Sequence, residues 1–234
     1  MRLANLSHKT STGLHIIIQN PMEKRIYEDV FDEGDYDEPI YQLLELKEGK
    51  TLTVLDLGSN VGFFIFRLIH LALSRGTSHQ FHIQGVEASQ KLCDESTKRF
   101  VKSKFSKKKF AISIHRGLIG PSAGEGIFYE FKDHGLSSVF RKDGKPETIP
   151  FIDLSAITTQ WHEIDLLKCD IEGSELIFLE NYPLLLEKVR FAVFEFHIEF
   201  CDYTNCVDII HQAGFKNSKV IRQSPQAMIE FFWK

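Results

Sequence analysis

The sequence lacks any long apolar run. None of its 234 residues belongs to a stretch that approaches the roughly 18 uncharged apolar residues a membrane span requires. The first residues are polar, with Asn5, Ser7, His8 and Lys9 where a signal peptide would carry its apolar segment. We therefore expect no membrane span and a soluble, cytoplasmic protein.

Cysteine is scarce, and its spacing excludes the common metal and redox motifs. The four cysteines, Cys93, Cys169, Cys201 and Cys206, contain no Cys-x-x-Cys pair and fall within expected helices and strands. Buried free thiols are the favoured interpretation. Because 43% of the residues are hydrophobic, the chain can bury the core of one α/β domain with additions.

The Gly-x-Gly-x-x-Gly motif of nicotinamide and flavin binders is also absent. Instead, residues 52–57 read as a buried strand, and Gly58 and Gly62 form a Gly-x-x-x-Gly turn before the apolar, helical stretch 63–73. Glycines would let a ligand approach the backbone closely, and the amides that open the helix carry partial positive charge. Asp56 at the strand end would repel a pyrophosphate but attract an ammonium group.

A second carboxylate is expected at the end of the next strand. Residues 81–88 end near Glu87, which lies 25 residues after Gly62. In a doubly wound sheet, a carboxylate at this place accepts hydrogen bonds from a ribose diol. An amino-acid head on a ribose describes S-adenosylmethionine (SAM) better than NAD.

Three stretches, residues 54–63, 85–88 and 167–175, together resemble the FkbM family of SAM-dependent methyltransferases. The first is common to many class I methyltransferases, whereas the Lys-x-Asp-Ile-Glu-Gly-x-Glu motif that begins at Lys168 is more specific. Order and spacing match over roughly residues 30–200.

The fold prediction combines this resemblance with the strand and helix pattern. We expect an α/β, Rossmann-like, doubly wound, seven-stranded, mostly parallel sheet with an antiparallel C-terminal edge strand. Residues 51–234 would form the methyltransferase domain, and residues 1–50 an N-terminal extension packed on it. Core strands are expected at residues 52–57, 81–88, 110–115, 164–170 and 191–197, a helix at 201–213, and an antiparallel pair at 215–221 and 226–233.

Two additions are expected outside this core. The extension contains a strand at 15–19 and a helix at 38–46, with an acidic loop, residues 32–38, before the helix. Alternating residues at 126–131 and 137–140 predict a β-hairpin insertion. The segment 124–145 would overhang the strand ends as an acceptor-binding lid.

The resemblance and the position of the glycine turn predict the cofactor site. The third strand is not followed by an acidic residue that could bind the adenine amino group, so backbone groups near Gly117 and Leu118 would have to serve. The expected cofactor-binding residues are Asp56, Gly58, Ser59, Asn60, Gly62, Phe63, Glu87, Ala88, Gly117, Leu118 and Asp170.

The carboxyl ends of the fourth and fifth core strands offer candidate catalytic residues, Asp170, Glu172, Glu195 and His197. Crowded carboxylates either raise one another's pKa, which leaves one as a base, or share a divalent cation that acidifies the acceptor. The sequence leaves both versions open, and His197, if its pKa is unperturbed, is a candidate base that would titrate near about 6.5.

Three further residues are weaker candidates. His134 lies in the expected lid and is the next candidate base. Tyr36 and Glu38 lie in the acidic segment that the resemblance places near the cofactor or acceptor.

The resemblance implies an O-methyltransferase that uses SAM and a small-molecule acceptor, a hydroxyl on a sugar or secondary metabolite. One alternative is a non-catalytic or differently specific Rossmann-like binding module. Another is an RNA-directed methyltransferase that uses residues 98–109, which hold seven cations and no acid. Without an RNA-binding module beside it, this stretch is better interpreted as a solvated helix face, and nucleic acid is not an expected partner.

Overall fold

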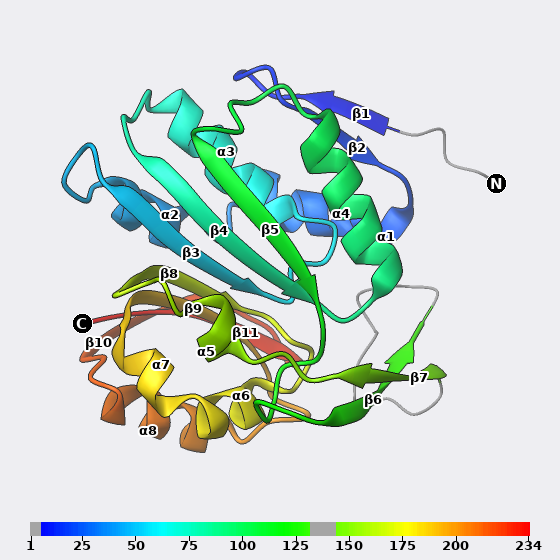
Figure 1. The fold of residues 1–234 in the computed structure, drawn as a ribbon, viewed down its shortest axis with the longest axis vertical. Coiled ribbons are helices and arrows are strands. Elements are labelled where there is room, and N and C mark those ends of the chain that lie inside the picture. The colour runs from blue at the N-terminus through cyan, green and yellow to red at the C-terminus, as the bar shows by residue number, and fades with distance from the viewer. Residues whose placement is uncertain (1–5, 132–143) are drawn as a thin grey trace.

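The computed structural model describes residues 6–131 and 144–234, and its centre is a seven-stranded sheet (Figure 1). Five strands run parallel: β3 (Thr51–Leu57), β4 (Gln80–Glu87), β5 (Phe110–Arg116), β8 (Ile164–Cys169) and β9 (Val189–His197). The strand order is β10-β11-β9-β8-β3-β4-β5. The order reverses between β3 and β8, so their carboxyl ends open onto one crevice. The predicted doubly wound, mostly parallel sheet is confirmed.

The chain ends in the predicted antiparallel pair, β10 (Asn217–Gln223) and β11 (Ala227–Trp233). β11 also pairs antiparallel with β9. The pair therefore forms this edge of the sheet, with β10 outermost and the C-terminal strand one place further in.

Helices cover both faces of the sheet because successive apolar side chains of its strands point to opposite faces. Leu52 and Val54 of β3 join one hydrophobic cluster, and Leu55 and Leu57 join another. The first cluster packs under α2 (Asp37–Leu44), α3 (Phe63–Ser74) and α4 (Gln90–Lys102). The second packs under α5 (Leu154–Ile157), α6 (Glu175–Asn181), α7 (Pro183–Glu187) and α8 (Tyr203–Gln212), on the other side in Figure 1.

The N-terminal extension packs on the first of these faces. It consists of a hairpin, β1 (Leu6–Lys9) and β2 (His15–Ile18), then α1 (Pro21–Tyr27), a π-helical turn η1 (Glu28–Glu33), and α2. Leu14, Ile16 and Phe31 belong to the same cluster as β3 and α3. The extension therefore shares its core with the sheet.

The acidic segment 32–38 is not a solvated loop. It spans the end of η1 and the start of α2, and two of its carboxylates are held by arginines. Arg67 donates to both oxygens of Asp37 at 2.7 and 2.5 Å. Arg222 lies 2.8 Å from Asp35. These ion pairs hold the segment in its conformation, and the local sequence pattern does not predict them.

The predicted hairpin insertion is present, but its second strand differs. β6 (Glu125–Glu130) pairs antiparallel with β7 (Lys145–Pro150). Residues 137–140, predicted as the partner, and His134 lie outside the described residues. Phe128 and Ile149 of the hairpin form a small apolar cluster with Leu118, which fixes the hairpin above the end of β5.

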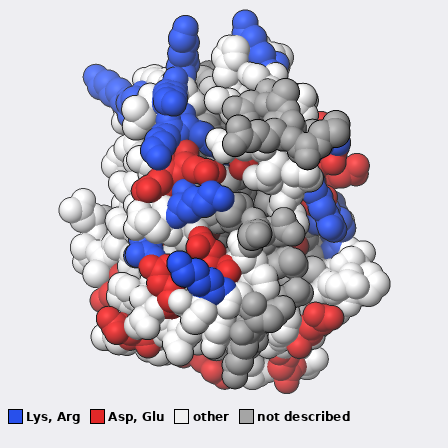
Figure 2. All heavy atoms as spheres, turned by 90° about the vertical axis from the view of Figure 1, so that its right-hand side faces the viewer, with Lys and Arg blue, Asp and Glu red and all other residues white. Residues whose placement is uncertain are grey.

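The basic stretch 98–109 lies on α4 and the loop that leads into β5. Arg99 is buried, and the Lys107 and Lys109 amines donate to the carbonyls of Phe100 and Thr77. The exposed lysines lie toward the end of α4 and the start of β5. Figure 2, which views the right-hand side of Figure 1, shows Lys and Arg side chains gathered at its upper end. Because the end of α4 and the start of β5 lie at the opposite end of β5 from its carboxyl end, the position of these lysines weakens the RNA-directed alternative.

All four cysteines are buried and free, as predicted. Within the described ranges, none of the helices combines the length and the apolar character that crossing a bilayer requires.

Arg99 on α4 and Glu23 on α1 should anchor the extension to the core. Their side chains are 8% and 2% exposed and 2.8 Å apart. Arg99→Met leaves the Glu23 carboxylate buried without its cation, so we expect the free energy of unfolding to fall by about 3–5 kcal/mol. Urea denaturation measures this loss.

Lys24→Met is the matched control, because the Lys24–Glu28 pair is exposed and should contribute less than about 1 kcal/mol. Adding Glu23→Gln to Arg99→Met should recover part of the loss. Equal losses of stability in Arg99→Met and Lys24→Met would contradict this anchoring role. Two separate unfolding transitions in the wild type would show that the extension and the core do not unfold as one cooperative unit.

Candidate active site

The glycine turn between β3 and α3 packs against the protein itself. Gly58 and Gly62 have φ values of 76° and 85°. A Cβ on Gly58 would lie 1.7 Å from the Asp170 carbonyl oxygen, and one on Gly62 would lie 2.5 Å from the Phe100 ring. The expectation that both glycines make room for a ligand is thus corrected, because Gly62 lines neither cavity described below.

Lys168 connects the ends of β8 and β3 at the floor of the crevice. Its ammonium donates to the Gly58 carbonyl at 2.7 Å and lies 3.5 Å from Asp56 and 3.3 Å from Asp170. Burial alone would lower the pKa of Lys168, but Asp170 and Asp56 raise it, so this buried side chain stays charged. Lys168 therefore fixes both the turn and the Asp170 carboxylate.

Asp56 faces Lys168 and not the crevice. It is 0% exposed and is absent from the lining of either cavity. Burial raises the pKa of Asp56, and the charge of Lys168 opposes that rise. Asp56 is therefore paired with Lys168 and has no surface open to a ligand in this arrangement, and its predicted contact with a ligand ammonium stays a prediction.

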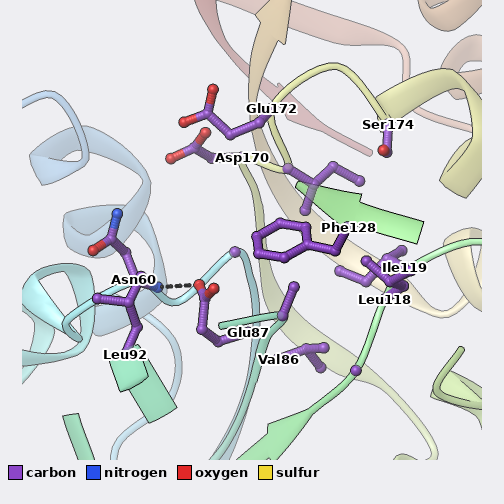
Figure 3. A pocket seen from close by; sticks show the side chains of 14 residues that line it. Asn60, Val86, Glu87, Leu92, Leu118, Ile119, Phe128, Asp170, Glu172 and Ser174 are labelled. Carbon is purple, nitrogen blue, oxygen red and sulfur yellow. Dashed lines mark hydrogen bonds between the residues drawn. The ribbon is translucent and has the colours of Figure 1, made fainter. Parts of the chain in front are cut away.

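Glu87 ties the glycine turn to β4 and faces a cavity. Its carboxylate accepts from the backbone amides of Asn60 and Ser89, both at 2.9 Å, and Figure 3 shows the bond to Asn60. Asn60 has φ 47°, so this bond holds a residue in a conformation that is uncommon without glycine. Burial raises the pKa of Glu87.

A first cavity of about 80 Å³ opens between Glu87 and the hairpin. Phe128 of β6 projects into it (Figure 3). The other apolar lining residues are Val86, Ala88, Leu92, Leu118, Ile119 and Ile171. The Phe128 ring accounts for the narrowness of the cavity.

Gly117 and Leu118 line this cavity as predicted, but their amides are already used. The Gly117 amide donates to the Glu87 carbonyl at 3.1 Å, and the Leu118 amide to the Pro150 carbonyl at 3.0 Å. These two amides are therefore not free to bind adenine, and recognition of its amino group by backbone groups near Gly117 and Leu118 stays a prediction.

A second cavity of about 720 Å³ lies between the extension, the turn and the ends of β8, β9 and β11. Its lining includes Ser59, Phe63, Glu195 and His197 from the predicted site. Gly58, Asn60, Asp170 and Glu172 line both cavities, so the two cavities meet at these residues. On the outer side, Arg222 joins β10 to the extension by pairing with Asp29 and Asp35 at 2.7 and 2.8 Å.

His197 lies between two carboxylates. Its Nδ1 is 3.0 Å from Glu175, which is fully buried, and its Nε2 is 3.4 Å from Glu172. Burial alone would lower the pKa of His197, but the hydrogen bond and charge of Glu175, together with Asp170 and Glu172, raise it to about 10. His197 is therefore an imidazolium at neutral pH, and its predicted role as a base near pH 6.5 is corrected.

The other two acids become the candidate bases. Burial and the charge of Asp170 raise the pKa of Glu172 to about 8 and that of Glu195 to about 7. Tyr36 donates to Glu195 at 3.2 Å, which brings this predicted residue into the site. Glu38 instead forms an exposed ion pair with Lys219 at 2.5 Å and lines neither cavity.

Asp170, Glu172 and His197 offer ligand atoms within 4.8 Å of one another. Both ring nitrogens of His197 already face carboxylates, and a metal ion would have to displace the proton of an imidazolium whose pKa is about 10. The imidazolium supplies the positive charge at this point.

Sequence reasoning missed Lys168, Glu175, Phe128 and Arg222. The Lys-x-Asp-Ile-Glu-Gly-x-Glu motif contains the first two, but their partners come from β3 and β9. Phe128 and Arg222 follow from the placement of a hairpin and an edge strand, for which the local sequence offers no signal.

Gly58→Ala tests the close packing of the turn. The new methyl would clash with the Asp170 carbonyl, so we expect a lower melting temperature and displaced site residues. Gly76→Ala is the matched control, because Gly76 also has positive φ but a Cβ added there would meet nothing within 4 Å. Both variants should lose about 1–2 kcal/mol of stability from the strain of positive φ. Gly58→Ala alone should lose more than this, because of the clash, when the denaturation of the two variants is compared. Equal destabilisation would contradict the packing role.

Neither a protein-family model nor a curated protein sequence matches the chain. Among solved structures, it is similar to methyltransferase FkbM from Methylobacillus flagellatus, with a TM-score of 0.50 and 16% identity over 80% of this chain and 45% of that one. It is also similar to magnesium protoporphyrin IX methyltransferase from Synechocystis with bound SAM, with a TM-score of 0.51 and 13% identity over 93% of this chain and 86% of that one. The chain thus spans less than half of the FkbM structure. These likenesses establish the Rossmann-like fold of SAM-dependent methyltransferases, and membership of the FkbM family stays a prediction.

Proposed function

We propose that this protein is a SAM-dependent methyltransferase that methylates a hydroxyl of a small-molecule acceptor, a sugar or secondary metabolite. The observation that carries the proposal is the meeting of two cavities at Asp170 and Glu172, with Glu87 on one side and Glu195 on the other. Methyl transfer requires two ligands that approach each other at one point, and this arrangement provides it.

The first cavity suits the nucleoside. Glu87 would accept hydrogen bonds from the ribose hydroxyls, since its oxygens already point toward the glycine turn. Leu92, Leu118 and Phe128 would contact the base, after the Phe128 ring has shifted to widen the cavity. The hairpin would therefore contribute to the cofactor site, whereas the sequence predicts that it binds the acceptor.

The second cavity suits the amino-acid end of SAM and the acceptor. Tyr36, Phe63 and Ile229 give it apolar surface, and the carboxylates at the ends of β8 and β9 give it a polar floor. SAM supplies a methyl group on a positively charged sulfur. Glu195 would accept the proton of the acceptor hydroxyl, because its pKa of about 7 makes it an effective base near neutral pH.

Lys168 and His197 would position the carboxylates at the junction of the two cavities. Lys168 holds Asp170, and His197 holds Glu172, each through an ion pair of 3.3–3.4 Å. A binding module without catalysis would need no such fixed carboxylates where its cavities meet. The direct test is isothermal titration calorimetry with SAM and S-adenosylhomocysteine (SAH), and absence of binding by either would refute the proposal.

Glu87→Ala should weaken SAH binding about 10- to 100-fold, because the ribose hydroxyls lose a charge-assisted acceptor. Calorimetry measures the change. Glu38→Ala is the control and should leave the affinity unchanged, since Glu38 pairs with Lys219 on the surface. A Glu87→Ala protein that binds SAH as tightly as the wild type would contradict the ribose assignment.

Glu195→Gln should lower turnover by about 10²- to 10⁴-fold while SAH affinity is retained. Because the base acts when deprotonated, kcat/KM for SAM should rise as pH passes upward through about 7, the pKa of Glu195 in the free protein. The acceptor for this assay comes from a screen of methyl transfer from labelled SAM into cell extract. Unchanged turnover in Glu195→Gln would assign the base elsewhere, with Glu172 the next residue to test.

A further inference from the structure

The junction of the two cavities has more acids than cations. In the described part of the chain, two cations beside it are each shared between two carboxylates: Lys168 between Asp56 and Asp170, and His197 between Glu175 and Glu172. On the outer side of the second cavity, Arg222 is likewise shared between Asp29 and Asp35. Glu195 is a further acid, and its hydrogen bond comes from the neutral Tyr36 hydroxyl. Acids outnumber cations even when Arg25, which also lines the second cavity, is included. Adding another positive charge here is therefore favourable.

Under the proposed function, the sulfur of SAM lies at this junction. Glu87 fixes the ribose in the first cavity and Glu195 meets the acceptor in the second, so the atom that joins nucleoside and amino acid lies beside the shared residues Asp170 and Glu172. In SAM this sulfur is a sulfonium cation, whereas in the product SAH it is neutral. The two ligands otherwise present the same groups.

We propose that Glu172 and Glu195 share an exchangeable proton in the free protein and release it when the sulfonium of SAM binds. A base is then available only when a methyl donor is present. During transfer, the acceptor oxygen forms a bond to the methyl carbon, the sulfur keeps the electron pair of the bond that breaks, and the acceptor proton passes to Glu195. The sulfur is then neutral, and the next SAM expels the proton to solvent.

The acid strengths agree with this geometry. With pKa values of about 8 for Glu172 and about 7 for Glu195, the pair carries about one proton at pH 7.5. Burial is the largest cause of both raised pKa values. The charged groups that adjust them are Asp170, Glu175, Lys168, His197 and Arg222, and Glu195 also raises the pKa of Glu172. An opposite charge within about 4–6 Å lowers a carboxyl pKa by about 1 to 3 pH units, enough to expel most of that proton.

The test is calorimetry of SAM and SAH binding at pH 7.5 in buffers of different ionisation enthalpy, which counts the protons released. SAM should release about 0.5 to 1 proton more than SAH. Equal release with the two ligands would overturn the inference while leaving the methyltransferase proposal intact. Failure of both ligands to bind would instead remove the proposed function.

Two variants locate the proton. Glu172→Gln combined with Glu195→Gln should abolish the difference between SAM and SAH, whereas Glu180→Gln, an exposed acid on α6, should preserve it. SAH affinity in the double variant reports whether the site has folded. A difference that persists in a double variant that still binds SAH would assign the proton elsewhere and overturn the inference.

A measurement on the wild type alone gives the same decision if the double variant does not fold. Deprotonated carboxylates bind a sulfonium better, so the ratio of the SAH and SAM dissociation constants should rise about tenfold between pH 6.5 and 8.5. A ratio that is flat across this range would overturn the inference.

Discussion

A buried lysine between two aspartates is the constraint on which this site depends. Asp56 on β3 and Lys168 on β8 are direct neighbours in the parallel register, and Asp170 follows one step beyond the strand. Removing either partner of such a pair leaves an unpaired charge in the protein interior, which costs several kcal/mol. Loss of any one of the three residues would therefore destabilise the fold. Because Lys168 also donates to the Gly58 carbonyl, the same group sets the glycine turn. The backbone of the glycine turn and the Asp170 carboxylate are thus positioned by one ammonium.

The acids around this lysine follow from strand geometry. Alternate residues of a strand share a face, and Leu52 and Val54 belong to the cluster that packs under α3, so Asp56 has to point to that same face. Val193 belongs to this cluster as well, which places Glu195 and His197 on the same face of β9. The sheet therefore concentrates charged side chains at one end of its apolar face. Their pKa values rise because burial and like charge disfavour ionisation, and the pKa of His197 rises because two acids hold its proton.

This geometry also explains what the sequence predicts well and what it does not. Strands, the glycine turn and the helix after it depend on local pattern, so β3, α3 and β4 occur where the pattern indicates. Strand alternation then places Asp56 on the same face of β3 as Leu52 and Val54. Its partner was not, because Lys168 lies 112 residues later and only the strand order brings the two together. Phe128 in the first cavity and the imidazolium state of His197 likewise depend on contacts between distant segments.

The excess of carboxylates bears on the class of ligand more strongly than the fold does. A Rossmann-like sheet serves many cofactors, and a likeness of 16% identity leaves the chemistry open. Nucleotide cofactors with a pyrophosphate need cations or free amides at the glycine turn, yet the Asn60 amide here donates to Glu87 and the nearby Lys168 is shared by Asp56 and Asp170. A phosphate would meet Asp170 and Glu172 at the point where the cavities join. A nucleoside with a positively charged centre meets the opposite situation, since each carboxylate that repels a phosphate attracts a sulfonium. The charge of the site therefore favours a sulfonium nucleoside over a dinucleotide on electrostatic grounds alone.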